Sequence, residues 1–127
     1  LLPYISPSKR TIANFESIFG ILAILGEKDV HGVLRELEPV IDRLVVTQNS
    51  SERALPVEDL YQAAIKVFGD ARVFKEPDLR SAITNTIEQC TLLNQTSEGI
   101  SAVLITGSVV TAGESRTILR HISEVRG

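Results

Sequence analysis

The polar residues best placed to do chemistry stand directly after short apolar stretches of the sequence. They form four groups, at residues 26–29 (GEKD), 48–53 (QNSSER), 76–78 (EPD) and 107–111 (GSVVT). In an open parallel sheet, ligands bind at the carboxyl ends of the strands, where helix N-termini also point. The four groups therefore predict a binding edge. Because loops are polar in any fold, an ordinary solvated surface explains them equally well at this stage.

Anion binding is the chemistry that these groups favour. Gly107 would let a ligand approach the backbone, and the N–H groups of a helix that follows could receive a carboxylate or a phosphate, although Ser108 could equally serve as a helix cap. Lys28 could meet an anionic substrate, whereas Asp29 fits better as a helix N-cap. The guanidinium of Arg53, in the same loop as Asn49, could form a bidentate pair with a carboxylate, but an unliganded surface arginine is the commoner case.

Several other kinds of site are excluded or disfavoured. Cys90 is the sole cysteine, which rules out an internal disulfide and a zinc site built from cysteines, and its place among apolar residues at helical spacing predicts a core residue. Because His31 and His121 are far apart in sequence, we expect no metal site. The sequence has neither a Gly-x-x-x-x-Gly-Lys-Ser/Thr loop nor a Gly-x-Gly-x-x-Gly motif. We therefore expect no catalytic residue in this part of the protein.

The elements that must position these residues follow from the hydrophobic pattern. Apolar stretches at residues 21–25, 44–47, 71–74 and 102–106 predict strands, the third of them at an edge because charged residues alternate with apolar ones. Helical spacing follows Asp29, Pro56 and Pro77, and again covers residues 113–125, while residues 92–99 read as a surface loop. This alternation predicts an α/β fold: a mostly parallel, Rossmann-like sheet with helices on both faces.

Composition places the chain among globular domains. Its 127 residues are 43% apolar and 23% charged, and 13 Lys+Arg against 16 Asp+Glu give a net charge of −3, which disfavours a nucleic-acid partner. No apolar run is long enough to span a membrane and no secretory signal is visible, so we expect a cytoplasmic location without a membrane partner. We expect an irregular, truncated segment over residues 1–18 and one α/β domain over residues 19–127. The absence of methionine suggests a piece of a longer chain.

Four stretches together resemble one family. Residues 20–30 (GILAILGEKDV), 37–43 (LEPVIDR), 46–54 (VTQNSSERA) and 104–114 (LITGSVVTAGE) are similar, in order and spacing, to the C-terminal domain of the bacterial folylpolyglutamate synthases/dihydrofolate synthases. These enzymes belong to the Mur ligase superfamily. The resemblance covers residues 18–122 and implies the C-terminal domain fold of the Mur ligases.

The resemblance implies a function as the substrate-closing domain of an ATP-dependent amide ligase. In such a ligase, MgATP phosphorylates a carboxylate of folate or dihydropteroate, and the amino group of L-glutamate attacks the acyl phosphate. An Asn-Pro-Arg stretch in the equivalent loop reads the incoming amino acid in the superfamily. By that analogy Asn49 and Arg53 are expected to bind L-glutamate. Ser50, in the same loop, and Ser108, at a helix N-terminus, are expected to make further contacts with it. Lys28 and Asp29 are expected to face the cleft toward the ATPase domain.

Departures from the family pattern limit what this chain is expected to do alone. Family members carry an Asp-Gly-Ala-His-Asn-Pro segment just before this domain, and residues 1–14 contain nothing like it. The central domain, which holds the P-loop, most of the contacts to ATP and Mg²⁺, and the folate site, is also missing. We therefore expect no catalysis by the 127 residues alone. The alternative is a free-standing or remnant α/β module that binds a ligand or a partner without catalysis.

Overall fold

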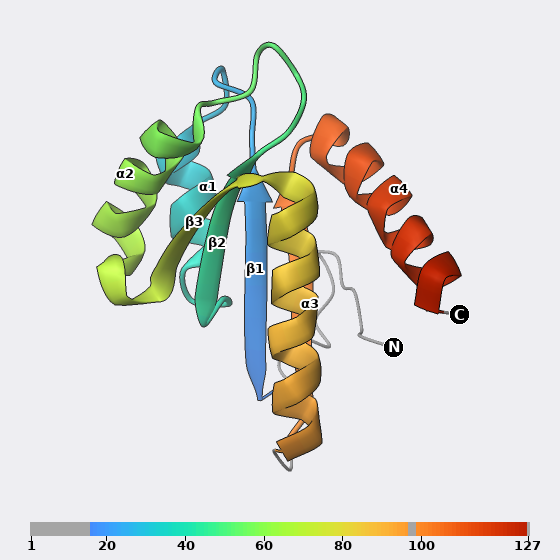
Figure 1. Ribbon diagram of the computed structural model, residues 1–127. Coiled ribbons are helices and arrows are strands. Elements are labelled where there is room, and N and C mark those ends of the chain that lie inside the picture. Colours follow the sequence, from blue (N-terminus) through green and yellow to red (C-terminus); the bar gives the residue numbers. More distant parts are fainter. Residues whose placement is uncertain (1–15, 97–98, 127) are drawn as a thin grey trace.

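The structure is a computed structural model that describes residues 16–96 and 99–126, and it has an α/β architecture (Figure 1). Four strands, β1 (Ser17–Ala23), β2 (Arg43–Gln48), β3 (Val73–Asp78) and β4 (Ser101–Gly107), form a parallel sheet in the order β3-β2-β1-β4. Four α-helices connect or follow them: α1 (Val30–Leu37), α2 (Val57–Phe68), α3 (Leu79–Thr96) and α4 (Val109–Arg126), with a short 3₁₀ helix at Asp70–Arg72. The predicted parallel sheet between helices is confirmed, and the third strand lies at an edge as expected.

Two hydrophobic layers hold the helices against the sheet. The side chains of β1 alternate between them, because successive residues of a strand point to opposite faces. Leu22 joins the cluster under α1 and α2, and Ile21 joins the cluster under α3 and α4. Ile21 lies in register with Val45 of β2 and Ile105 of β4, which places β1 at the centre of the sheet. Central parallel strands are buried on both faces, which explains their continuous apolar sequence.

The first strand begins earlier than its predicted range of 21–25. β1 starts at Ser17 and leaves the sheet after Ala23, so that Gly20 lies inside the strand and does not bound it. A β-carbon at Gly20 would lie 2.4 Å from Cδ1 of Ile41, so the Ile41 side chain would have to shift to accommodate any other residue there. Of the segment predicted to be irregular, residues 1–15 lie outside the described part of the chain, and Ser17 and Ile18 belong to β1.

The last two helices also differ from their predicted bounds. Pro77 lies within β3 and does not open a helix; Asp78, the last residue of β3, caps α3 instead, accepting a hydrogen bond of 2.9 Å from the Ser81 backbone N–H. α3 continues to Thr96 through the predicted loop, because Leu93 packs against the core and Asn94 accepts a 2.7 Å hydrogen bond from the Ser101 N–H. α4 begins at Val109, four residues earlier than predicted.

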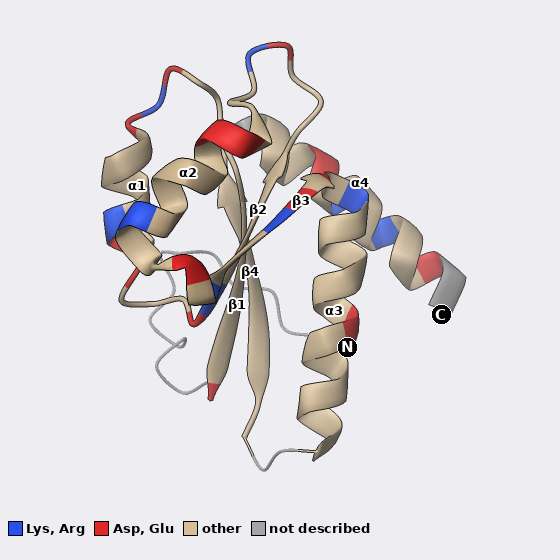
Figure 2. Cartoon of the chain, turned by 60° about the vertical axis from the view of Figure 1, so that its left-hand side comes forward, with Lys and Arg blue, Asp and Glu red and all other residues tan. Residues whose placement is uncertain are grey.

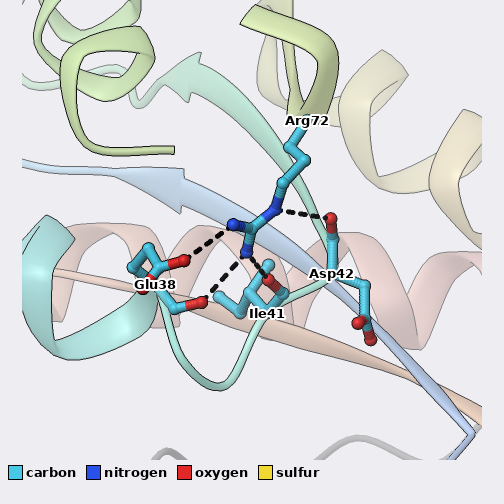
Figure 3. Close-up of polar contacts among 4 residues, drawn as sticks. All are labelled: Glu38, Ile41, Asp42 and Arg72. Carbon is cyan, nitrogen blue, oxygen red and sulfur yellow. Dashed lines mark hydrogen bonds and ion pairs between the residues drawn. The ribbon is translucent and has the colours of Figure 1, made fainter. Parts of the chain in front are cut away.

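An arginine fixes the turn between α1 and β2 (Figure 3). Arg72 donates to three carbonyl oxygens, those of Glu38 at 3.0 Å, Ile41 at 2.5 Å and Asp42 at 3.2 Å, and pairs with the Glu38 carboxylate at 2.7 Å. Its guanidinium carbon also lies 4.8 Å from the ring centre of Phe68. The Glu38 carbonyl lies at the end of α1, where carbonyl oxygens lack partners within the helix, and the carbonyls of Ile41 and Asp42 lie in the turn that follows; Arg72 donates to all three. This cluster is structural and does not belong to the candidate site.

Two side-chain predictions are confirmed by burial and capping. Cys90 is fully buried in the cluster under α3, and burial raises the pKa of its thiol, which makes it a poor nucleophile. Asp29 caps α1, accepting a 3.1 Å hydrogen bond from the Gly32 N–H. Within the described residues, no helix combines the length and hydropathy needed to cross a membrane.

Candidate functional site at the carboxyl edge of the sheet

Two loops meet where the central strands end. The loop after β1 and the loop after β2 are joined by a backbone hydrogen bond of 2.9 Å from Gly26 to Arg53 and by another of 2.9 Å from Leu55 to Ile24. Leu25 and Ala54 form an isolated antiparallel bridge between them. The tips of both loops carry charges of both signs (Figure 2). Lys28 and Arg53, which the sequence placed in separate groups, thus belong to one double loop.

Asn49 is the residue that connects the β2 loop to α4. It is 5% exposed, and its Nδ2 donates to Oγ1 of Thr111 at 3.0 Å and to Oγ of Ser108 at 3.3 Å. Its Oδ1 accepts from the Ser51 backbone N–H at 3.0 Å. Both amide hydrogens and one acceptor position are therefore already used within the protein. Asn49 and Ser108, two predicted glutamate-binding residues, lie in contact, and Asn49 acts as a brace between two elements.

Gly107 allows the end of β4 to approach the end of β1. Its φ is +140°, and a β-carbon there would lie 1.8 Å from the carbonyl oxygen of Ala23, so the position requires glycine. Thr111 donates a 2.6 Å hydrogen bond to the same carbonyl oxygen. Ser108 caps α4 by accepting from the Thr111 N–H at 3.2 Å. The capping role of Ser108 is thus present, and its hydroxyl still lies at the helix N-terminus, where an anion is favoured.

Glu114 is a site residue that sequence reasoning missed. Its Oε1 accepts from the Ser50 backbone N–H at 3.0 Å, and its Oε2 accepts a short hydrogen bond from the Ser50 hydroxyl. An internal carboxylate therefore occupies the two donors of Ser50. Glu114 lies in the stretch of residues 104–114 that resembles the family. No spacing rule, however, indicates its contact with Ser50, which is 64 positions away along the chain.

Glu27 lies in the predicted 26–29 group but was not singled out from the sequence, and it faces Arg53. An ion pair joins Nη2 of Arg53 to Oε1 of Glu27 at 2.5 Å, with side chains that are 67% and 56% exposed. The Arg53 backbone N–H also donates to Oγ of Ser51 at 3.1 Å. Lys28 is exposed beside Glu27 at the tip of the same loop, and Asp29 is engaged as the α1 cap. The structure thus brings Asn49, Ser50 and Ser108 together, with Arg53 and Lys28 on the adjoining double loop.

Two hollows lie elsewhere on the surface. One has a volume of about 500 Å³ and the other of about 180 Å³; both are lined by Phe19, Arg43 and Gln89 and lie between α3 and the sheet. Glu76 of the predicted strand-end groups lines the smaller one, and neither is lined by a residue expected to bind L-glutamate or to face the ATPase cleft. We give more weight to the strand-end site, because loop donors and a helix N-terminus converge there.

The donors at the strand-end site suit the binding of a carboxylate. The guanidinium of Arg53, the hydroxyls of Ser50 and Ser108 and the N-terminus of α4 are all donors or partial positive charges. In the described part of the chain, no three His, Cys, Asp or Glu side chains are grouped as metal ligands would be. The arrangement can hold and orient an anion, and it contains no activated nucleophile.

Comparisons with known proteins agree with this architecture. No protein-family model matches the chain. The chain is 43% identical over 111 residues to a dihydrofolate synthase/folylpolyglutamate synthase of Mycobacterium tuberculosis, a match that covers 83% of this chain and 23% of the relative. A solved structure of the M. tuberculosis folylpolyglutamate synthase, complexed with ADP and AMPPCP, is 45% identical with a TM-score of 0.77, over 82% of this chain and 24% of that one.

A second species gives the same fold. The folylpolyglutamate synthase of Thermotoga maritima is 26% identical, with a TM-score of 0.63, over 83% of this chain and 21% of that structure. The chain therefore spans less than a quarter of the length of these relatives. Over most of its own length, the chain is similar in sequence and in fold to part of the dihydrofolate/folylpolyglutamate synthases.

Proposed function

We propose that this chain is the substrate-closing C-terminal domain of an ATP-dependent amide ligase that adds L-glutamate to folate or dihydropteroate. The observation that carries the proposal is the match to folylpolyglutamate synthases over 83% of the chain. It is combined with hydrogen-bond donors that can receive a carboxylate and that gather at one edge of the sheet. L-Glutamate brings two carboxylates, and its amine must stay free to attack. Hydrogen-bond donors that hold the two carboxylates fix the substrate in place and leave its amine free.

Each site residue has a distinct role in this proposal. Arg53 and the hydroxyls of Ser50 and Ser108 contact carboxylates of L-glutamate. Asn49 holds Ser108 and the β2 loop at a fixed separation through its buried amide. The carboxylate of Glu114, which occupies the donors of Ser50 in the free domain, has to move when Ser50 receives the substrate. Lys28 and Asp29 face the cleft toward the ATPase domain.

ATP and Mg²⁺ belong mainly to the other part of the proposed ligase. The described residues of this chain gather no set of ligands that fits a metal ion, so we assign no metal-dependent step to them. What they contribute is the binding and orientation of the amine substrate and, when the domain closes, the exclusion of water from the activated carboxylate. Exclusion matters because water would hydrolyse an acyl phosphate before the amine attacked it.

The test is the kinetics of the full-length ligase with Arg53→Ala and Ser108→Ala, measured as ADP release dependent on L-glutamate. Loss of a charge-assisted hydrogen bond predicts a KM for L-glutamate raised about tenfold or more for Arg53→Ala. Arg116→Ala, at an exposed position of α4, is the control and should leave the KM unchanged. An unchanged KM in either site variant removes that residue from the proposed site. The isolated 127 residues should show no folate-dependent ATP turnover.

A further inference from the structure

Glu27 and Arg53 come from different loops yet form the one ion pair at the tip of the double loop among the described residues. The backbones of the two loops are already joined by the hydrogen bonds from Gly26 to Arg53 and from Leu55 to Ile24. The ion pair therefore adds little to holding the loops together. What it does fix is the direction of one long side chain, because the guanidinium has four rotatable bonds between it and the backbone.

The exposure of the pair shows that it contributes little to the stability of the fold. Its two side chains are 67% and 56% exposed, and ion pairs in that setting contribute little to folding because water and salt screen them. Arg72 is the contrast within the same chain, because its guanidinium donates hydrogen bonds to three carbonyl oxygens and a carboxylate. Arg53 uses Nη2 alone on Glu27 and holds no other side-chain bond in the described residues, so its Nε and Nη1 hydrogens remain available.

We infer that Glu27 is a positioning residue, which holds the Arg53 guanidinium at the carboxyl edge of the sheet so that its remaining N–H groups meet a carboxylate of the amine substrate. The inference rests on the proposed function. A freely rotating arginine would lose side-chain entropy on binding, and the ion pair restricts part of that freedom beforehand. Glu27 also balances the arginine charge in the free domain without burying it.

The experiment is a double-mutant cycle in the full-length ligase, with Glu27→Gln, Arg53→Ala and the double variant. Because misdirected substrate contacts are costly, Glu27→Gln should raise the KM for L-glutamate about five- to tenfold while kcat changes less than about twofold. In the Arg53→Ala background, Glu27→Gln should have no further effect, since a residue that acts through Arg53 has nothing left to position.

Two controls separate this role from general effects. Glu58→Gln removes another exposed ion pair, that of Glu58 with Lys75, and should leave the KM for L-glutamate unchanged. The thermal midpoint of Glu27→Gln should match that of the unchanged protein, because the pair is exposed. A midpoint that falls together with kcat would show a structural role and overturn the inference.

The outcomes distinguish the inference from the proposed function. If the full-length protein shows no ADP release dependent on L-glutamate, the proposed function fails and the inference fails with it. If Arg53→Ala raises the KM but Glu27→Gln does not, the inference alone is overturned. If the effects of the two substitutions on the KM simply multiply, Glu27 acts independently of Arg53, and its assignment as a positioning residue is wrong.

Discussion

The amide nitrogen of Asn49 lies 3.0 Å from the hydroxyl oxygen of Thr111, which in turn donates to the carbonyl oxygen of Ala23 at 2.6 Å. This chain of bonds runs from the end of β2 through the first turn of α4 to the end of β1. Both Asn49 and Thr111 are buried, so the bonds are protected from competition with water. The candidate site is consequently built on a buried, hydrogen-bonded floor, and exposed side chains such as Ser50 and Arg53 lie at its rim.

Replacing Asn49 with alanine should weaken both the fold and the site. The substitution leaves the Thr111 and Ser108 hydroxyls without their amide partner and removes the acceptor of the Ser51 N–H. Unsatisfied buried polar groups cost about 1–3 kcal/mol, so the free energy of unfolding in urea should fall by that amount. Ser51→Ala, which removes only a hydroxyl from the same loop, is the control and should cost less. Equal stability of the two variants would show that Asn49 is not a brace.

Arg72→Ala should be strongly destabilising for a residue at the surface. The substitution strips partners from three carbonyl oxygens and the Glu38 carboxylate (Figure 3). We expect a loss of about 2–3 kcal/mol in the free energy of unfolding, measured by urea denaturation. Arg72→Lys should recover less than half of the loss, because an ammonium cannot reproduce the planar fork of donors. Arg80→Ala, at an exposed position of α3, is expected to change stability little.

Two glycines near α4 should respond to alanine in opposite directions. Gly107→Ala places a β-carbon against the Ala23 carbonyl at a positive φ, and should cost about 2 kcal/mol or more. Gly113→Ala, within α4 and with open space around its β-carbon, should stabilise by about 0.5–1 kcal/mol. Thermal unfolding of both variants tests this directly. A stable Gly107→Ala protein would contradict the close approach of β1 and β4.

Thr47 offers a substitution that should improve stability. It is fully buried in β2, and its hydroxyl oxygen has no hydrogen-bond partner in the described residues. Thr47→Val keeps the shape and removes a buried unsatisfied polar group, so the free energy of unfolding should rise by about 1 kcal/mol. Val46→Thr, the reverse change at the adjacent buried position, should destabilise. A loss of stability in Thr47→Val would indicate a bound water at this hydroxyl.

Stability should depend on pH through the cap of α3. The hydroxyl of Ser81, and then its backbone N–H, hydrogen-bond the Asp78 carboxylate and hold its pKa below the ordinary value. A carboxyl with a depressed pKa in the folded state stabilises fully above its unfolded pKa, and loses that contribution as pH falls through the folded pKa. Asp78→Asn should therefore flatten the acid limb of the stability curve, measured by urea unfolding across the acidic range. An unaltered acid limb would show that other carboxyls dominate it.

Local patterns in the sequence were sufficient to predict the element types and the parallel sheet. Apolar runs such as residues 102–106 predict a buried strand because both of its faces must avoid water, and Asp29 was assigned correctly as a cap from its position alone. The bounds of the elements were harder to predict. Gly20 resembled the end of a strand, and only the tertiary structure shows that it lies inside β1, packed against the side chain of Ile41.

The composition of the candidate site was decided by tertiary structure. The family resemblance assigned Asn49, Ser50, Arg53 and Ser108 to L-glutamate. Strand-end reasoning selected only the loops that hold them, because parallel strands bring their carboxyl ends to one edge. It could not find the contacts of Glu27 or Glu114, whose partners are 26 and 64 positions away along the chain. Nor could it show that the Asn49 amide donates its hydrogens to the hydroxyls of Ser108 and Thr111 at the start of α4. Sequence periodicity reports which face of an element is buried, whereas pairing between loops depends on how the elements pack.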